Sequence, residues 1–327
     1  MAATMTAITV RDGKGPAANL IPVELPIPEP KPGQVLIRVR AAGVNRPDVI
    51  QRLGYYPPPP GAPDTLGLEV AGEVAAVGDE TPRWRIGDQV TALLPGGGYA
   101  QYAVVDARHA LPIPEGLDFV QAASLPETVF TVWANVFDIG RLAAGETCLI
   151  HGATSGIGVA AMQMAKAAGA RVIATGRGAD KAAQAAALGA DVAVDASAGN
   201  WAEAVQAAGG ADVVLDMVGG DYTPRNIEVL KPAGRLVQIA ILGGVKAEVD
   251  LGLIMRKRLT VTGSTLRPRD ADEKARLARA VEATVWPWIA AGKLKPVIDS
   301  TFPLVEAAKA HARMEDGRHL GKIVLVA

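Results

Sequence analysis

A glycine-rich turn carries the strongest chemical signal in the sequence. The string His151-Gly-Ala-Thr-Ser-Gly-Ile-Gly158 follows the apolar run 147–151 directly and precedes an Ala-rich segment of helical character. Small residues in such a turn let the backbone approach a pyrophosphate, and the helix that follows offers free N–H groups and the positive end of its dipole. Compared with G-x-G-x-x-G, the first two glycines are Ala153 and Ser155. The strand–turn–helix context predicts dinucleotide binding, with a purely structural turn as the alternative.

The end of the next strand indicates which dinucleotide is bound. A carboxylate there would bind the ribose 2′-hydroxyl of NAD, but the strand ends Ala174-Thr-Gly-Arg177 without an acid. Arg177 and Lys181 can neutralise a 2′-phosphate, which a carboxylate would repel. We therefore expect NADPH, with ordinary solvated charges at a helix start as the alternative.

The sequence offers few residues for other chemistries. The one cysteine, Cys148, lies in an apolar run, and the four histidines show no paired ligand spacing. No thiolate zinc site is expected from such a set, so the metal assignment is none. We find no Ser/His/Asp or paired-carboxylate arrangement for nucleophilic or acid–base catalysis. The expected chemistry is hydride transfer, with the completing proton drawn from water.

The elements that must position these residues change character near residue 124. Before it, Gly and Pro are dense and β-type runs such as Val35–Val44 alternate with period two. After it, strands and helices alternate, which predicts a doubly wound parallel sheet of six strands. The strands are expected at 147–151, 171–175, 192–194, 212–218, 235–240 and 259–263, and the helices at 127–137, 156–168, 180–188, 201–207 and 272–290, the last interrupted by Pro287. The tail 321–326 is expected to return as a strand to the N-terminal β unit, and the active site to lie in a cleft between the two parts.

Composition excludes several classes of protein. The chain has 327 residues, of which 49% are hydrophobic and 20% charged, and its net charge is −1. No basic run marks a nucleic-acid or membrane surface, so neither partner is expected. The start lacks a secretory pattern, and no apolar run approaches the ~18 residues of a membrane span. These features predict a cytoplasmic enzyme.

The two-part plan resembles the medium-chain dehydrogenase/reductase superfamily. Its zinc enzymes carry a cysteine where this chain has Asn45, a Gly-His-Glu where it has Gly67-Leu-Glu69, and a four-cysteine lobe where it has Pro95–Tyr102. The match is sharper with the zinc-free quinone oxidoreductase branch, and specifically with p53-inducible-type NADPH quinone oxidoreductases. The strings that carry it are Ala42-Gly-Val-Asn-Arg46, Gln51-Arg-Leu-Gly-Tyr-Tyr-Pro-Pro-Pro-Pro-Gly61, Leu66-Gly-Leu-Glu-Val-Ala-Gly72, Leu125-Pro-Glu-Thr128, Gly263-Ser-Thr-Leu-Arg-Pro-Arg269 and Gly321-Lys-Ile-Val-Leu325.

The resemblance implies a fold, an activity and a set of site residues. It implies a GroES-like β-rich catalytic domain over 1–123 and 266–327, a Rossmann domain over 124–265, a homodimer paired through sheet edges, and NADPH-dependent quinone reduction. Asn45 and Tyr56 are placed in the nicotinamide and substrate cleft. For Arg267, a role in the cleft, at the surface or at a dimer contact stays open. The expected cofactor-binding residues are Thr131, Thr154, Ser155, Gly156, Ile157, Gly158, Thr175, Gly176, Arg177, Lys181, Gly243, Ser264 and Leu266.

The chain departs from the family pattern at the ribose end. Arg177-Gly178 stands where the family has Gly-Ser, and Asp195-Ala196 stands where it has Asn-Tyr. The tyrosine that helps hold the 2′-phosphate is therefore missing, and Arg177 is left to compensate.

A physical argument supports Asn45 and Tyr56. Hydride addition to a quinone or enone places negative charge on an oxygen, and an amide N–H and a phenol can stabilise it. The alternatives are a turn residue bonding its own backbone for Asn45 and an exposed loop aromatic for Tyr56, with Tyr55 the expected bystander. Two other functions stay open: a double-bond reductase of enones or enoyl thioesters, and a cofactor-binding structural or regulatory protein.

Overall fold

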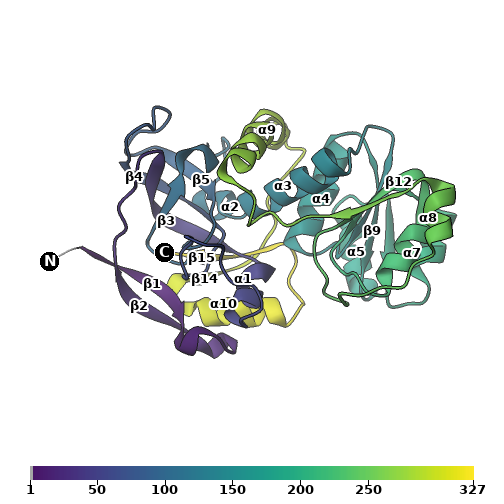
Figure 1. Ribbon diagram of the computed structural model, residues 1–327, viewed down its shortest axis with the longest axis horizontal. Coiled ribbons are helices and arrows are strands. Elements are labelled where there is room, and N and C mark those ends of the chain that lie inside the picture. Colours follow the sequence, from purple (N-terminus) through teal and green to yellow (C-terminus); the bar gives the residue numbers. More distant parts are fainter. Residues whose placement is uncertain (1–2) are drawn as a thin grey trace. The chain divides into compact units, whose positions relative to one another are not determined.

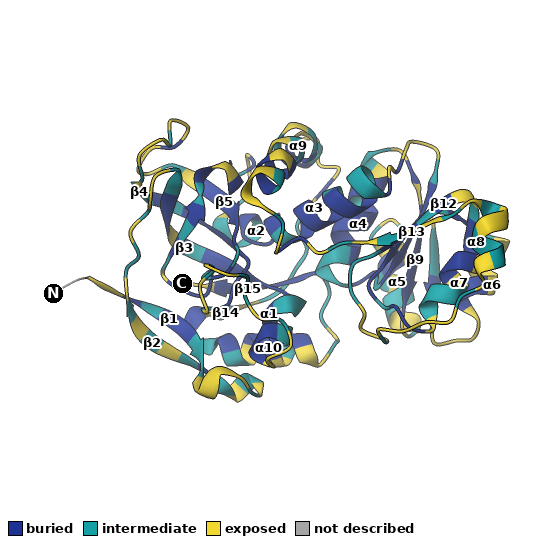
Figure 2. Ribbon diagram, viewed as in Figure 1, coloured by how far each residue is buried: buried dark blue, intermediate teal, exposed yellow. Residues whose placement is uncertain are grey.

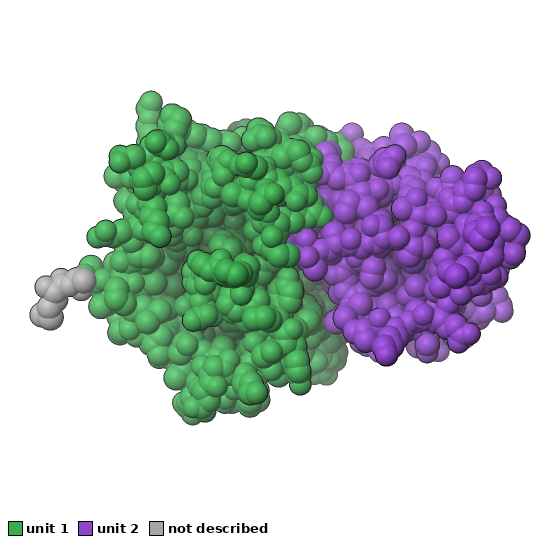
Figure 3. All heavy atoms as spheres, viewed as in Figure 1, with its two compact units in different colours: residues 1–130, 267–290, 296–327 green, residues 131–266, 291–295 purple. Residues whose placement is uncertain are grey.

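The computed structural model describes residues 3–327. The chain forms two compact units, which Figure 3 shows in two colours. Unit 1 comprises Met1–Phe130, Arg267–Ala290 and Pro296–Ala327, and unit 2 comprises Thr131–Leu266 and Ala291–Lys295. Each unit has its own sheet system and its own hydrophobic core.

Unit 1 is built around a seven-stranded sheet (Figure 1). Its strands follow the order β14-β15-β3-β4-β5-β7, with β6 paired to β3, and β1 and β2 form a separate antiparallel pair. The strands are β1 (Thr4–Val10), β2 (Leu20–Pro26), β3 (Gln34–Val44), β4 (Glu69–Val77), β5 (Gln89–Leu93), β6 (Tyr102–Asp106), β7 (Ala110–Pro112), β14 (Ile298–Pro303) and β15 (Lys322–Val326).

The alternation read from the sequence is seen in part of β3. Val35, Ile37 and Val39 are buried in the core of unit 1 and Arg38 is exposed, but Leu36, on the face of Arg38, is also buried. The C-terminal strand β15 pairs antiparallel with β3, with Val324 opposite Gly43. The predicted return of the tail to the N-terminal β unit is therefore confirmed.

The helices of unit 1 cover this sheet and its edges. They are α1 (Arg46–Arg52), α2 (Phe119–Ala122), α9 (Ala271–Ala290) and α10 (Ala307–Glu315), with short 3-10 turns η1 (Arg11–Gly13), η2 (Ala17–Asn19), η3 (Ala107–His109) and η5 (Leu304–Glu306). The predicted interruption at Pro287 is wrong, because α9 runs through it. Val281, Val285 and Ile289 are buried on either side of the proline. Their packing holds the last turn despite the missing N–H.

Unit 2 contains the predicted parallel sheet. Its order is β10-β9-β8-β11-β12-β13, which in chain order is 3-2-1-4-5-6, and every pair is parallel. This is the doubly wound dinucleotide-binding arrangement, with the reversal of strand order between β8 and β11. The strands are β8 (Thr147–His151), β9 (Arg171–Gly176), β10 (Val192–Asp195), β11 (Ala211–Asp216), β12 (Leu230–Gln238) and β13 (Thr260–Gly263). The predicted six-stranded sheet is confirmed.

The helices of unit 2 follow its strands. The chain enters the unit within α3 (Pro126–Val132), which continues as a π-helical segment, η4 (Trp133–Ile139). The others are α4 (Gly156–Ala167), α5 (Ala179–Ala187), α6 (Trp201–Ala207), α7 (Tyr222–Val229) and α8 (Leu251–Lys257). Figure 2 shows buried residues concentrated in the central strands and exposed ones on α8. Among residues 3–327, no helix is both long and apolar enough to cross a bilayer.

Candidate active site

The glycine turn of unit 2 has the geometry of an anion-binding helix start. Ser155 is the N-cap of α4, where its Oγ accepts a hydrogen bond from the Gly158 N–H at 3.0 Å and donates to the Gly152 carbonyl at 2.8 Å. A Cβ on Gly158 would lie 2.3 Å from that same carbonyl oxygen, so only glycine fits. The predicted residues Thr154, Ser155, Gly156, Ile157 and Gly158 thus lie in one turn that a pyrophosphate can approach.

A buried polar network lies at the ends of the neighbouring strands. The turn bonds to β9 through the Ala153 N–H and the Thr175 carbonyl at 3.0 Å. The Thr175 hydroxyl, almost fully buried, lies 2.8 Å from His151 Nδ1. His151 Nε2 lies 2.7 Å from the side-chain oxygen of Asn226, whose amide donates to Asp216 at 3.0 Å. Desolvation lowers the pKa of His151, which holds the ring neutral.

Sequence reasoning missed this network. His151, Asn226 and Asp216 are polar residues at the carboxyl ends of apolar strands or on the helix that follows, which was an available signal. Their partners could not be read from spacing, because 75 residues separate His151 from Asn226. The network fixes the strand ends from which the turn emerges.

The loop after β9 brings Gly176 and Lys181 together. A Cβ on Gly176 would lie 2.7 Å from the Cβ of Lys181, so the glycine permits this close approach. Arg177 between them is exposed. The two predicted cations therefore lie close together in sequence, Arg177 in the connection after β9 and Lys181 in the first turn of α5.

A carboxylate that the prediction of cofactor preference did not weigh lies at the same connection. Asp195, at the end of β10, accepts hydrogen bonds from the backbone N–H groups of Gly178 and Ser197, each at 2.8 Å. The Ser197 and Gly178 donors lower the pKa of Asp195, which is therefore ionised at neutral pH. The ends of β9 and β10 therefore carry charges of both signs.

Two further predicted residues are linked through the π-helical segment. The Thr131 carbonyl accepts a hydrogen bond from the amide of Asn135 at 2.8 Å, and the amide oxygen of Asn135 accepts one from Ser264 Oγ at 2.7 Å. Thr131 and Asn135 are buried. π-Helical turns recur at functional sites, and here the turn joins Thr131 to the end of β13.

Gly243 and Leu266 are not joined to these groups by hydrogen bonds. Gly243 lies on the exposed connection after β12, and its N–H donates to the Val218 carbonyl at 2.7 Å. Leu266 is buried, with 6% of its surface exposed. The structure therefore places Gly243 beside the end of β11, and Leu266 is a buried apolar residue.

Asn45 lies in a buried charged cluster of unit 1, at the N-terminus of α1. Its amide nitrogen donates to Glu69 Oε1 at 2.8 Å, and its oxygen accepts from Lys322 Nζ at 2.5 Å. Lys322 also pairs with Glu69 Oε1 at 2.6 Å, and the Glu69 side chain is fully buried. Asn45 also has the local bonds of the alternative, because it is the N-cap of α1 and its amide nitrogen lies 3.5 Å from the Gly43 carbonyl oxygen, but its shorter side-chain bonds are to residues distant in sequence.

Two neighbouring carboxyl groups have shifted acidities. Glu69 Oε2 accepts the backbone N–H of Glu127 at 2.8 Å. Desolvation and, after it, the Glu69 charge raise the pKa of Glu127 to about 8. Desolvation also raises the pKa of Asp48 to about 6, although Asp48 accepts hydrogen bonds from the Asn45 N–H at 2.8 Å and the Tyr99 hydroxyl at 3.1 Å.

Tyr56 lies half-buried on the loop after α1 and is stacked on an arginine. The guanidinium carbon of Arg267 lies 5.4 Å from the centre of the Tyr56 ring. Tyr55 is 81% exposed, so the description of an exposed loop aromatic fits Tyr55 and not Tyr56. Desolvation, followed by the Glu127 charge, raises the pKa of Tyr56. Arg267 is only 5% exposed, which rules out a surface role for it.

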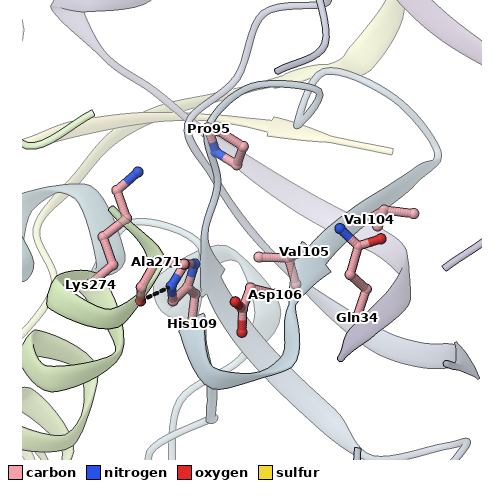
Figure 4. A pocket seen from close by; sticks show the side chains of 8 residues that line it. All are labelled: Gln34, Pro95, Val104, Val105, Asp106, His109, Ala271 and Lys274. Atoms are coloured by element: carbon pink, nitrogen blue, oxygen red, sulfur yellow. Dashed lines mark hydrogen bonds between the residues drawn. The ribbon is translucent and has the colours of Figure 1, made fainter. Parts of the chain in front are cut away.

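A cavity of about 270 Å³ lies elsewhere in unit 1 (Figure 4). In this view the His109 ring bonds to the Ala271 carbonyl at 2.9 Å, and the Lys274 amine points away from it. The cavity contains none of the predicted site residues. Its lining residues are Gln34, Pro95, Val104, Val105, Asp106, His109, Ala271 and Lys274.

The described part of the chain offers no cluster of three His, Cys, Asp or Glu side chains that could hold a metal ion. Cys148 lies inside β8, where burial raises the pKa of its thiol to about 12. Asn45, at the position where the zinc enzymes carry a cysteine, is bonded to Glu69 and Lys322.

Comparison with known proteins agrees with this architecture. A family model described as "Alcohol dehydrogenase GroES-like domain" matches residues 31–115, and one described as "Zinc-binding dehydrogenase" matches residues 188–325. The rat protein named quinone oxidoreductase is 32% identical over 98% of each chain. A mycobacterial phthioceranic/hydroxyphthioceranic acid synthase is 34% identical over 90% of this chain, which corresponds to 14% of the synthase.

Solved structures give the same result. An Escherichia coli quinone oxidoreductase complexed with NADPH superposes with a TM-score of 0.89 at 28% identity, over 98% of this chain and 100% of that one. A Pseudomonas syringae quinone oxidoreductase gives 0.87 at 31% identity, over 99% and 100%. The fold and the turn define an oxidoreductase with a GroES-like part and a Rossmann-like parallel sheet. The chain belongs to the quinone oxidoreductases of the medium-chain dehydrogenase/reductase superfamily.

Proposed function

We propose that this protein is an NADPH-dependent quinone oxidoreductase that transfers hydride without a metal ion. The observation that carries the proposal is the end-to-end similarity to quinone oxidoreductases, at 31–32% identity over 98% of each chain. The residues of the two units supply the parts that such a reaction needs. Unit 2 supplies a dinucleotide turn, and unit 1 supplies hydrogen-bond donors for a carbonyl oxygen.

The residues of unit 2 fit a dinucleotide phosphate. The Gly158 position excludes a Cβ, and although Ser155 Oγ occupies the Gly158 N–H, the positive end of the α4 dipole favours an anion at this turn. Arg177 and Lys181 favour a 2′-phosphate through their charge, whereas Asp195 opposes it. Because two cations outnumber one carboxylate, NADPH is the favoured cofactor. The preference for NADPH over NADH should be smaller than it would be without Asp195. Thr131, Ser264, Gly243 and Leu266 are assigned to the nicotinamide end, and Thr175 and Gly176 to the adenosine half.

The residues of unit 1 act on the substrate oxygen. When bound, NADPH supplies the hydride, which carries both electrons to the conjugated carbonyl. Tyr56 donates its phenolic hydrogen bond to the oxygen that gains negative charge. Asn45 is held in one orientation by Glu69 and Lys322, and its second N–H, which makes only a long 3.5 Å contact with the Gly43 carbonyl, is the second donor. Water supplies the proton that completes the reduction.

The catalytic domain is assigned to residues 1–123 and 266–327 and the cofactor domain to 124–265. These bounds differ from the two compact units at residues 124–130, 266 and 291–295. A homodimer is proposed through β13, the edge strand of the parallel sheet. Large apolar side chains are exposed on β13, on α8 and on the connection before α8, which supports burial against a second copy. They are Ile241, Leu242, Val245, Leu251, Met255 and Val261. The single, reduced cysteine fits a cytoplasmic location.

A double-bond reductase is the second candidate function. The similarity to the mycobacterial synthase covers 90% of this chain at 34% identity. An enone or an enoyl thioester would use the same hydride and the same donors, because its carbonyl oxygen also gains charge during reduction.

A substrate panel tests the proposal. Oxidation of NADPH is followed by absorbance with 1,2- and 1,4-quinones, enones and an enoyl thioester, each with and without a chelator. We expect quinone-dependent oxidation that the chelator does not change. Turnover confined to enones or thioesters would assign the protein to the double-bond reductases. Tight NADPH binding without turnover of any of these would favour a structural or regulatory cofactor-binding protein.

A further inference from the structure

Arg267 contains a buried hydrogen-bond donor without a partner. Its Nε donates to the Pro95 carbonyl at 2.8 Å, and its Nη1 donates to Gln51 Oε1 at 2.8 Å. Its Nη2 is buried and has no hydrogen-bond partner among residues 3–327. Buried polar atoms in native proteins are almost always paired, and an unpaired one calls for an explanation. A guanidinium N–H is an especially costly group to leave unpaired.

The arginine cannot turn to satisfy Nη2 without losing other bonds. Gln51, which holds Nη1, is itself fixed by a hydrogen bond from its Nε2 to the Asp64 carbonyl at 3.0 Å. The Arg267 carbonyl accepts from Lys274 Nζ at 2.7 Å. The Tyr56 ring lies over the guanidinium at 5.4 Å. The unpaired N–H groups are therefore held in a fixed direction before any ligand arrives.

Gly96 lets the loop backbone pass close to Nη2. A Cβ on this residue would lie 3.3 Å from Nη2 and 2.9 Å from the Pro63 carbonyl oxygen. Any side chain here would crowd the unpaired donor. The missing side chain leaves Nη2 bordered by a glycine and by the aromatic ring of Tyr56, a residue already assigned to the substrate.

The charges around Arg267 do not replace the missing partner. Asp48, Tyr56 and Glu127 raise its pKa through their charges, while burial lowers it. None of the three accepts a hydrogen bond from Nη2. What the site lacks is an oxygen atom that carries negative charge and reaches Nη2 directly, because charge-assisted hydrogen bonds are the strongest that a guanidinium makes.

We propose that Arg267 Nη2 binds the carbonyl oxygen of the substrate, beside the Tyr56 hydroxyl, and stabilises the negative charge that hydride transfer places on it. This inference rests on the proposed function. It identifies the residues that bind the carbonyl oxygen of a quinone or enone substrate. The hydride brings one hydrogen nucleus and two electrons to the conjugated system, and one electron pair moves onto the oxygen. Arg267 keeps all its protons, and water later protonates the oxyanion.

The test uses 4-nitrophenol, whose phenolate is coloured, as a mimic of the oxyanion. Bound beside a cation, the phenol ionises at lower pH than it does free. We expect the full-length protein to lower the ionisation midpoint of the probe, and Arg267→Gln to abolish that shift. Arg83→Gln is the matched control, because Arg83 pairs with Glu282 on the exposed side of the same unit. It should leave the shift unchanged.

Turnover provides the second readout. Arg267→Gln should lower kcat/KM for the quinone on the order of 100-fold, the usual cost of one oxyanion donor, while the Kd of NADPH stays unchanged. Arg267→Lys keeps the charge but cannot hold Pro95, Gln51 and a ligand together, so it should restore only part of the rate. Thermal unfolding shows whether each variant is folded.

Two results would overturn the inference. One is an unshifted probe with the unmodified protein, a measurement that needs no variant to fold. The other is full quinone turnover by folded Arg267→Gln, which would mean that Nη2 holds an internal water only. Because the probe needs neither NADPH nor turnover, a bound and shifted probe without quinone reduction would reject the proposed function and leave the oxygen site standing.

Discussion

The glycine turn of unit 2 and the buried cluster around Asn45 in unit 1 are two polar sites that are built in opposite ways. The turn of unit 2 spans residues 151–158 and is shaped by backbone hydrogen bonds and by the absence of a Cβ at Gly158. The cluster of unit 1 joins Asn45 to Glu69 and Lys322, which are 24 and 277 residues away in sequence. The first centre is local backbone geometry, whereas the second is buried side-chain charge assembled by the tertiary fold.

This difference determines which property each site should lose on substitution, ligand binding or stability. A backbone centre loses its ligand when a side chain intrudes, because the N–H groups cannot be approached. A buried charge cluster loses stability when one member is removed, because the remaining charge has no water and no partner.

The largest effect is expected in unit 1. Lys322→Met leaves the fully buried Glu69 carboxylate without its cation, which should lower the free energy of unfolding by about 3–5 kcal/mol. Denaturant unfolding followed by fluorescence measures the loss. The double variant Lys322→Met with Glu69→Gln should recover part of it, and a single variant as stable as the wild type would show that the pair contributes nothing.

The next effect is expected in unit 2. Gly158→Ala places a methyl 2.3 Å from the Gly152 carbonyl oxygen, so the turn must open and the phosphate site is lost. We expect the Kd of NADPH to rise about 100-fold, or ~2.7 kcal/mol, in calorimetric titration. Unaltered binding by a folded variant would remove the turn from the cofactor site.

Tyr56→Phe keeps the ring over Arg267 and removes only the phenol. The expected loss in kcat/KM for a quinone is about 10- to 100-fold, the range for a hydrogen bond to a charged group. Tyr55→Phe is the control, because Tyr55 is 81% exposed. Equal rates for the two variants would remove Tyr56 from catalysis.

The charges at the ribose end should act in opposite directions on cofactor choice. Arg177→Ala should lower the ratio of kcat/KM with NADPH to that with NADH about tenfold, or ~1.4 kcal/mol. Asp195→Asn removes a repulsive carboxylate and should raise the same ratio by about threefold, since exposed charges interact weakly. Equal use of both cofactors by the wild type would contradict the NADPH assignment.

A pH dependence of stability is expected from Glu127 in unit 1. Its pKa is raised from 4.5 to about 8, so the folded protein keeps a proton that the unfolded chain releases above about pH 4.5. The free energy of unfolding should therefore fall as the pH rises from about 4.5 to 8 and level off above 8. Glu127→Gln should lack this contribution, while the contribution from Asp48 remains in both proteins. Parallel stability profiles for the two would contradict the raised pKa.

The same contrast explains what the sequence could predict. The strand 147–151 and the helix 201–207 coincide with β8 and α6, because apolar runs and caps are local signals. Helix α1 was not predicted, although Asn45 and Asp48 around Pro47 form a helix-start pattern. A lysine such as Lys322 in the apolar run Gly321–Val326 requires a buried partner of opposite charge. The distance along the sequence gives no indication that this partner is Glu69.

Other differences between the sequence predictions and the structure arise where tertiary packing outweighs a local conformational preference. Pro287 is a local helix breaker, yet the buried face of α9 outweighs it. Arg267 could not be placed from its string alone, because its burial depends on Gln51 and Pro95 from elsewhere in unit 1. Asp195 was visible in the sequence, but its position beside Gly178 required the pairing of β10 with β9.

The central claim is two-electron reduction of a quinone by NADPH, and an anaerobic product assay tests it most directly. The protein is mixed with limiting NADPH, excess quinone and a chelator, and the hydroquinone formed is quantified by chromatography. We expect one hydroquinone for each NADPH consumed. Consumption of NADPH only when an enone or enoyl thioester replaces the quinone would contradict it.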